Sequence, residues 1–117
     1  MTDAPLLIHK RPDVPAHAVV LDLEGPVVIA HLFHFQTALR GQSAKLIVLD
    51  LSKVPYMDSS GLGAILNGYV SCEKNGRRLV LCGVSERVHA LLSLTKVDTI
   101  LKIYPDAEAA MANQHSS

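Results

Sequence analysis

The chain has 117 residues, of which 49% are hydrophobic and 19% are charged. This length fits one domain with its own core, and this composition is that of a globular protein rather than a disordered tail. Eleven basic residues offset eleven acidic ones, so the chain lacks the positive field that gives nonspecific affinity for DNA or RNA. We expect a single domain over residues 1–117, with a core from about residue 5 to about residue 112 and frayed ends.

Neither a targeting signal nor a membrane span is evident in the sequence. The longest apolar runs, such as Gly25–Ala30, fall far short of the ~20 residues that cross a bilayer, and the N-terminus lacks a signal-peptide layout. The sequence therefore predicts a cytoplasmic protein. Cys72 and Cys82 match neither a redox nor a zinc-ligand spacing, so we expect two reduced thiols in the core.

The first half of the chain predicts two strands, a helix and a third strand. Residues Leu6–His9 and Ala18–Glu24 have strand patterns and are joined by a short turn, which favours an antiparallel pair. Helical spacing begins near Ile29 and ends at Gly41, with an apolar stripe of Val28, Leu32, Phe35 and Leu39. The continuous apolar run Leu46–Asp50 is typical of a central strand covered on both faces.

The second half alternates helices and strands. Gly61–Asn75 predicts a helix that Gly76 ends, and Leu79–Cys82 predicts a buried strand. Ser85 begins a short helix that turns Val88, Leu91 and Leu92 inward, Ile100–Tyr104 predicts the last strand, and helix formers follow Pro105. The order ββαβαβαβα indicates an α/β fold with a mixed sheet of about five strands and about four helices.

The segment Asp58-Ser59-Ser60-Gly61 lies where a strand leads into a helix. Such residues commonly cap helices: the side chain accepts a hydrogen bond from a free backbone N–H group, which stabilises the helix by about 1 kcal/mol. They also place two hydroxyl groups at the positive end of a helix dipole, where a phosphate group is favoured. Gly61 and Gly63 cost roughly 0.5–1 kcal/mol each in a helix, which indicates either a close approach by a partner or tight packing against the sheet.

The run Met57-Asp58-Ser59-Ser60-Gly61-Leu62-Gly63, after a strand and before an amphipathic helix, resembles the STAS domain of the anti-sigma-factor antagonists of bacteria. The resemblance covers nearly the whole chain and implies the same element order. It also implies that a partner kinase, itself the anti-sigma factor, phosphorylates Ser59, with Ser60 as the weaker candidate. Asp58 matches the acidic position before the serine, which could orient the hydroxyl group or hold a magnesium-bound partner.

The function that this resemblance implies is that of a phosphorylation-switched binding module rather than an enzyme. Unmodified, it would bind the anti-sigma serine kinase; the added charge of about −1.5 to −2 would weaken that complex, and a serine phosphatase would reset the switch. No cofactor is expected, because the kinase would supply nucleotide and magnesium. The expected partner-binding residues are Tyr56, Asp58, Ser59, Ser60, Gly61, Leu62, Gly63 and Val28.

One segment departs from the family pattern. Antagonists usually carry a G-E-L-D-like segment after the second strand, where this chain has Gly25-Pro26-Val27-Val28. We therefore expect an apolar contact with the partner in place of a charged one. Phe33, which lies off the apolar stripe of its helix, is either an exposed interface aromatic or part of a wide buried stripe.

Other functions have weaker support in the sequence. A STAS subunit that serves as a scaffold in a transport or signalling complex, without a phosphorylation cycle, is the main alternative; Ser59 would then be only a cap. Gly63–Gly68 has P-loop glycine spacing but lacks the required lysine, and His31 and His34 lack a third metal ligand. An enzyme would need a paired acid and base or an oriented nucleophile, which the sequence does not offer.

Overall fold

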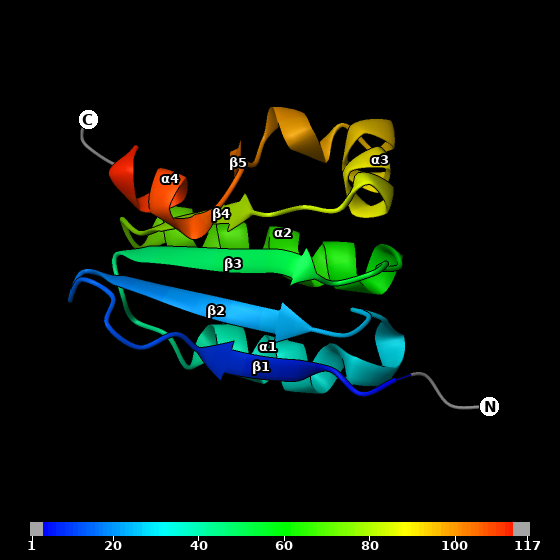
Figure 1. Ribbon diagram of the computed structural model, residues 1–117, viewed down its shortest axis with the longest axis horizontal. Coiled ribbons are helices and arrows are strands. Elements are labelled where there is room, and N and C mark those ends of the chain that lie inside the picture. The colour runs from blue at the N-terminus through cyan, green and yellow to red at the C-terminus, as the bar shows by residue number, and fades with distance from the viewer. Residues whose placement is uncertain (1–3, 114–117) are drawn as a thin grey trace.

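Five strands form one sheet in the order β1-β2-β3-β4-β5 in the computed structural model, which describes residues 4–113 (Figure 1). The strands are β1 (Leu7–Lys10), β2 (Ala18–Glu24), β3 (Leu46–Lys53), β4 (Arg78–Cys82) and β5 (Ile103–Tyr104). As predicted, β1 pairs with β2 antiparallel; the remaining pairs are parallel. The element order and the α/β class expected from the sequence are confirmed.

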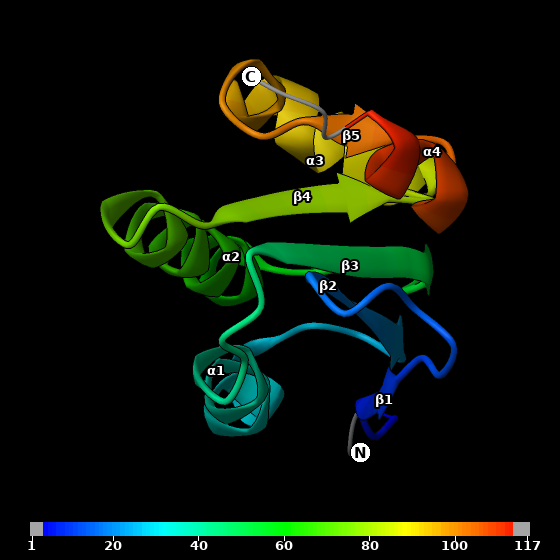
Figure 2. The ribbon, with the colours of Figure 1, turned by 90° about the vertical axis from the view of Figure 1, so that its left-hand side faces the viewer.

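Helices cover both faces of this sheet. They are α1 (Leu32–Arg40), α2 (Ser59–Lys74), α3 (Glu86–Leu94) and α4 (Ala107–Ala112), with short 3-10 turns η1 (Ile29–His31) and η2 (Val97–Thr99). Figure 2 shows α1 and α2 together on one side of the sheet and α4 on the other. The short helix α4 buries Ala107 and Ala110 against Val48, Val80 and Cys82.

Burial on two faces explains the continuous apolar run in β3. Ile47 and Leu49 belong to the core under α1 and α2, whereas Leu46 and Val48 belong to the smaller core under α4. Successive strand residues point to opposite faces, so both sets must be apolar. No helix within residues 4–113 is long and apolar enough to cross a bilayer.

Both cysteines lie in these cores. Cys72 and Cys82 are buried free thiols, as the sequence predicted. Burial raises the pKa of the Cys72 thiol, and burial together with the nearby Asp50 carboxylate raises the pKa of Cys82 to about 12.

The expected last strand over Ile100–Tyr104 is wrong in its first three residues. The chain forms a helical turn from Val97 instead of a strand. The amides of Ile100 and Leu101 both donate to the Val97 carbonyl oxygen, each at 2.9 Å. Leu101 is buried in the larger core, and only Ile103 and Tyr104 pair with β4. Smaller shifts affect other ends: α1 begins with a 3-10 turn, β3 continues to Lys53, and α2 begins at Ser59.

Candidate functional site

Two loops meet at the edge of the sheet where the parallel strands β2 and β3 end. The Gly25 amide donates to the Lys53 carbonyl oxygen at 3.0 Å, and the Val27 amide donates to that of Tyr56 at 3.2 Å. The Asp58 amide returns a bond to the Val27 carbonyl oxygen at 3.2 Å. These backbone bonds hold the β2–α1 loop against the β3–α2 loop, directly before the N-terminus of α2.

Asp58 joins both loops through its side chain. One carboxylate oxygen accepts from the Gly61 amide at 3.1 Å and so caps α2, while the other accepts from the Ile29 amide at 3.1 Å. The predicted helix cap is confirmed, and the capping residue is Asp58 rather than Ser59. Asp58 thus has a structural role, and the expectation that it orients the serine hydroxyl group or holds a magnesium-bound partner stays a prediction.

Gly61 allows the N-terminus of α2 to pack closely on the β2–α1 loop. A Cβ atom at Gly61 would lie 2.4 Å from the Val27 carbonyl oxygen and 2.7 Å from Val27 Cγ1. Tight internal packing therefore explains this glycine. Gly63 is different, because a Cβ atom there would meet nothing within 4 Å.

Ser59 is the exposed hydroxyl residue at this site. It occupies the first position of α2, directly after the Asp58 cap, whereas Ser60 is half-buried. Gly63 lies four residues after Ser59 and so on the same face of the helix. A modification at Ser59 would lie over the positive end of the α2 dipole.

Three of the expected partner-binding residues are buried, which corrects their predicted role. Val28 is 7% exposed, Leu62 is 6% exposed and Gly61 is buried, so none offers appreciable contact area. Between β2 and the end of α1, the large apolar side chains that reach the surface are Ile29, 68% exposed, and Phe33, 79% exposed. Sequence reasoning left Ile29 out, although its place outside the apolar stripe of α1 was a signal for exposure.

A third helix contacts this region through Tyr56. The Arg87 guanidinium of α3 lies over the Tyr56 ring, 4.9 Å from its centroid. Ser85 caps α3 and also donates its hydroxyl proton to the Val54 carbonyl oxygen at 3.4 Å. Tyr56 is half-buried, so the loop before Ser59 is fixed from two sides.

An ionic cluster that the sequence did not indicate lies on the α4 face of the same sheet edge. Asp22 and Asp50 are register partners on β2 and β3, and Arg11 binds both carboxylates, at 2.8 Å to Asp50. Burial opposes ionisation of Asp50, but hydrogen bonds from Ser52 and Arg11 outweigh it, so the pKa of Asp50 lies below its ordinary value. Arg11 is shared by the two adjacent carboxylates and offsets one of their two negative charges.

His31, one of the two histidines considered as metal ligands, forms a hydrogen bond with the backbone. His31 Nε2 lies 2.8 Å from the Ala4 carbonyl oxygen, a distance at which the ring nitrogen donates a hydrogen bond. This contact holds the segment before β1 against the start of α1. His34, one turn later, is exposed.

Comparisons with known proteins identify a single family. The sequence model of the STAS domain matches residues 7–110. An anti-sigma F factor antagonist of Paenibacillus polymyxa is 35% identical over 74 residues, a segment that is 63% of this chain and 63% of that relative. The match thus spans less than two thirds of the length of that protein.

Solved structures share the architecture. The crystal structure of a sulfate transporter family protein from Wolinella succinogenes superposes with a TM-score of 0.75 at 26% identity, covering 85% of each chain. That of an anti-sigma factor antagonist from Mycobacterium paratuberculosis has a TM-score of 0.80 and covers 95% of this chain and 97% of its own. At 19% identity the second likeness concerns the fold alone.

Proposed function

We propose that this chain, which belongs to the STAS domain family, is an anti-sigma-factor antagonist whose binding is switched by phosphorylation of Ser59. Unmodified, it binds an anti-sigma serine kinase and so releases a sigma factor; phosphorylated, it loses that affinity. A serine phosphatase resets the switch. This function requires a cytoplasmic protein, since sigma factors and ATP are found there.

One observation carries the proposal: Ser59 is exposed at the start of a helix whose cap is supplied by a different residue. A phosphate group on Ser59 therefore leaves the hydrogen bonds of Asp58 to Gly61 and Ile29 intact. The added charge is stabilised by the helix dipole, while a partner surface shaped for a neutral hydroxyl group rejects it. The modification changes binding and not folding.

The partner surface combines Ser59 and Gly63 with an apolar patch, Ile29 and Phe33, at the start of the first helix. The Ile29 amide is bonded to Asp58, so the patch begins next to Ser59. A Cβ atom at Gly63 would meet nothing within 4 Å, which leaves room for a partner backbone to approach α2 closely. Aromatic side chains are enriched at protein interfaces, and Phe33 is an exposed one.

The first test is phosphorylation itself. The purified protein is incubated with ATP, magnesium and the candidate anti-sigma kinase from the same genome, and intact mass is followed by mapping of the peptide Val54–Lys74. We expect one phosphate group on Ser59, its loss in Ser59→Ala, and its retention in Ser60→Ala. Phosphate on Ser60 alone, or none with an otherwise active kinase, contradicts the proposal.

The second test separates binding from folding. Ser59→Asp should abolish kinase binding while leaving thermal unfolding nearly unchanged, because Asp58 supplies the cap. Phe33→Ser should weaken binding, whereas Leu94→Ser, which removes an equally exposed apolar side chain (82% exposed) from α3, should not. Equal binding by all three variants would overturn the proposed surface.

A scaffold function is the second candidate, and the likeness to the Wolinella succinogenes sulfate transporter family protein favours it. In that case the apolar patch contacts another subunit and Ser59 is never modified. Ser59→Asp then keeps its complex, and Phe33→Ser still loses it. The same pair of variants thus distinguishes the two functions.

A further inference from the structure

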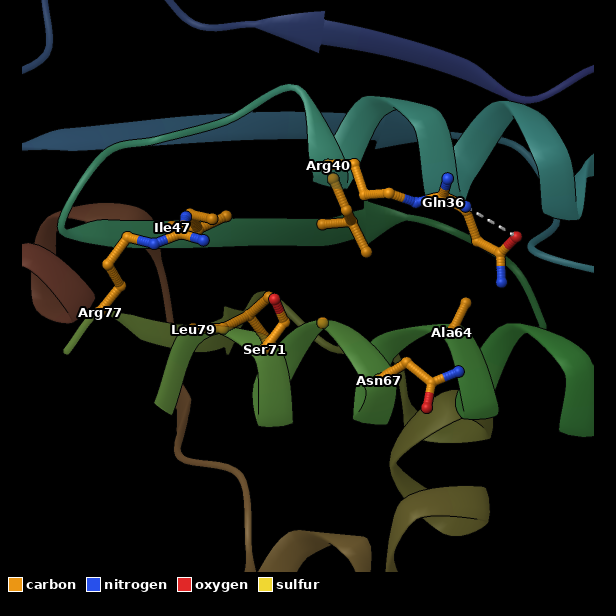
Figure 3. Close-up of a pocket in the computed structure, with 10 residues that line it drawn as sticks. Gln36, Arg40, Ile47, Ala64, Asn67, Ser71, Arg77 and Leu79 are labelled. Carbon is orange, nitrogen blue, oxygen red and sulfur yellow. Dashed lines mark hydrogen bonds between the residues drawn. The ribbon is translucent and has the colours of Figure 1, made fainter. Parts of the chain in front are cut away.

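A groove separates α1 from α2 away from Ser59, and it has the features of a small-molecule site. Its volume is about 300 Å³, at the lower end of the range typical of ligand pockets. Figure 3 shows Gln36 and Arg40 on α1, Ala64, Asn67 and Ser71 on α2, and Ile47 and Leu79 from the sheet behind them. We refer to it as the α1–α2 groove.

The floor of the groove is apolar and its depth depends on a glycine. Leu39, Ile47, Ala64 and Leu79 line it and are all buried core residues. A Cβ atom at Gly68 would contact Leu39 Cδ1 at 3.2 Å and Leu79 Cδ1 at 3.4 Å, so any side chain there would enter the floor. The groove therefore offers apolar surface to a ligand without a change in the core.

The rim of the groove is polar and carries one sign of charge. Arg40 and Arg77 are the only charged residues that line it. Among residues 4–113 neither forms an ion pair: Arg40 donates to the Gln36 side chain at 3.5 Å, and Arg77 donates to the Gln42 carbonyl oxygen at 2.9 Å. Each guanidinium has five N–H donors, so both keep donors for a further acceptor.

We propose that the α1–α2 groove binds a small organic anion, with an apolar body on the floor and a carboxylate or similar acidic head held by Arg40. Figure 3 shows Arg77 at the other end of the groove, where its charge adds to the positive field. Guanidinium groups recognise such heads through charge-assisted hydrogen bonds, and no acidic residue lines the groove to repel them. Asn67 and Ser71 add neutral polar groups to the lining. The site is separate from Ser59 and does not depend on the proposed switch.

Three probes of one shape and different charge test the site: 4-phenylbutyrate, 4-phenylbutanamide and 4-phenylbutylammonium. Inorganic phosphate serves as an anion without an apolar body. Binding is measured from amide chemical shifts of the full chain in two-dimensional NMR. We expect the carboxylate to bind on the order of tenfold more tightly than the amide, with the largest shifts at Asn67, Gly68 and Ser71, and the ammonium and inorganic phosphate to bind weakest.

Variants then test the two cations. Arg40→Gln changes an exposed residue and should weaken 4-phenylbutyrate on the order of threefold to tenfold while leaving the amide probe unchanged. Arg77→Gln tests the second cation. If that variant proves unstable, Arg77→Lys, which keeps the charge but removes the guanidinium group, is used in its place. Lys74→Gln removes the same charge from α2 outside the groove and should have no effect. Three outcomes would overturn the proposal: equal affinity for the carboxylate, amide and ammonium probes, chemical-shift changes outside the groove, or no binding at millimolar probe concentration.

Discussion

Gly61 and Gly63 are two positions apart in α2. Replacing each by alanine should nevertheless change the free energy of unfolding in opposite directions. Alanine at position 61 brings its Cβ atom to 2.4 Å from the Val27 carbonyl oxygen. This oxygen belongs to a backbone that three hydrogen bonds hold in place, so a rotamer change cannot relieve the clash. Alanine at position 63 meets nothing within 4 Å.

The expected magnitudes follow from two opposing effects. Overpacking in a fixed environment costs roughly 1–3 kcal/mol, while replacing glycine by alanine inside a helix returns about 1 kcal/mol. For Gly61→Ala the clash is with backbone, which places the cost at about 2–3 kcal/mol, so we expect a net loss of about 1–2 kcal/mol in the free energy of unfolding. For Gly63→Ala only the helix gain remains, which is roughly 0.5–1 kcal/mol.

Urea unfolding of both variants, followed by circular dichroism, measures this contrast directly. The two midpoints should lie on opposite sides of the wild-type midpoint, with little change in slope, since neither variant alters the surface exposed on unfolding. If both variants proved equally stable, or if Gly63→Ala were the less stable one, the packing explanation for Gly61 would be refuted. Gly63→Ala is also informative in the kinase-binding assay, where a loss of affinity would support close approach of the partner.

Other consequences concern the ionic cluster and the thiols. Arg11→Met should lower the free energy of unfolding by on the order of 1–2 kcal/mol in a urea titration, because it leaves Asp22 and Asp50 adjacent without their cation; partial exposure limits the cost, and an unchanged midpoint would contradict this role. The folded state lowers the pKa of Asp50, so its contribution is complete above the ordinary value of about 4 and is lost as the pH falls through the lower folded value. Asp50→Asn should remove that part of the acid dependence, and an identical acid profile would argue against it. Cys72 and Cys82 should react with a thiol reagent only after unfolding, since burial raises the pKa of both; rapid labelling of the native protein would count against their burial.

Local patterns were sufficient to predict most of the fold. The Asp-Ser-Ser-Gly junction predicted a capped helix, and Asp58 caps α2. The continuous apolar run of β3 predicted a strand covered on both faces, and helices lie on both. These signals depend on neighbouring residues alone, which is why a single sequence carries them.

The last strand shows where such patterns fail. The apolar residues of Ile100–Tyr104 read as an extended strand, yet Leu101 reaches the core from a turn. A short apolar run is compatible with either geometry, and only the position of α3 decides between them. Tertiary contacts also decide the ionic cluster, because Arg11, Asp22 and Asp50 come from three separate segments of the chain.

The sequence indicates where the candidate site lies but not which of its side chains are exposed, and that difference affects how the proposed switch would work. The sequence marks Ser59 and the start of α2, but it cannot show that Val28 is buried and Ile29 exposed, since that depends on the hydrogen bonds between the two loops. Those same bonds fix the surface around Ser59 before any partner arrives. A rigid surface changes little on binding, so a charge added at Ser59 acts on the partner contact and is not absorbed by movement of the loop.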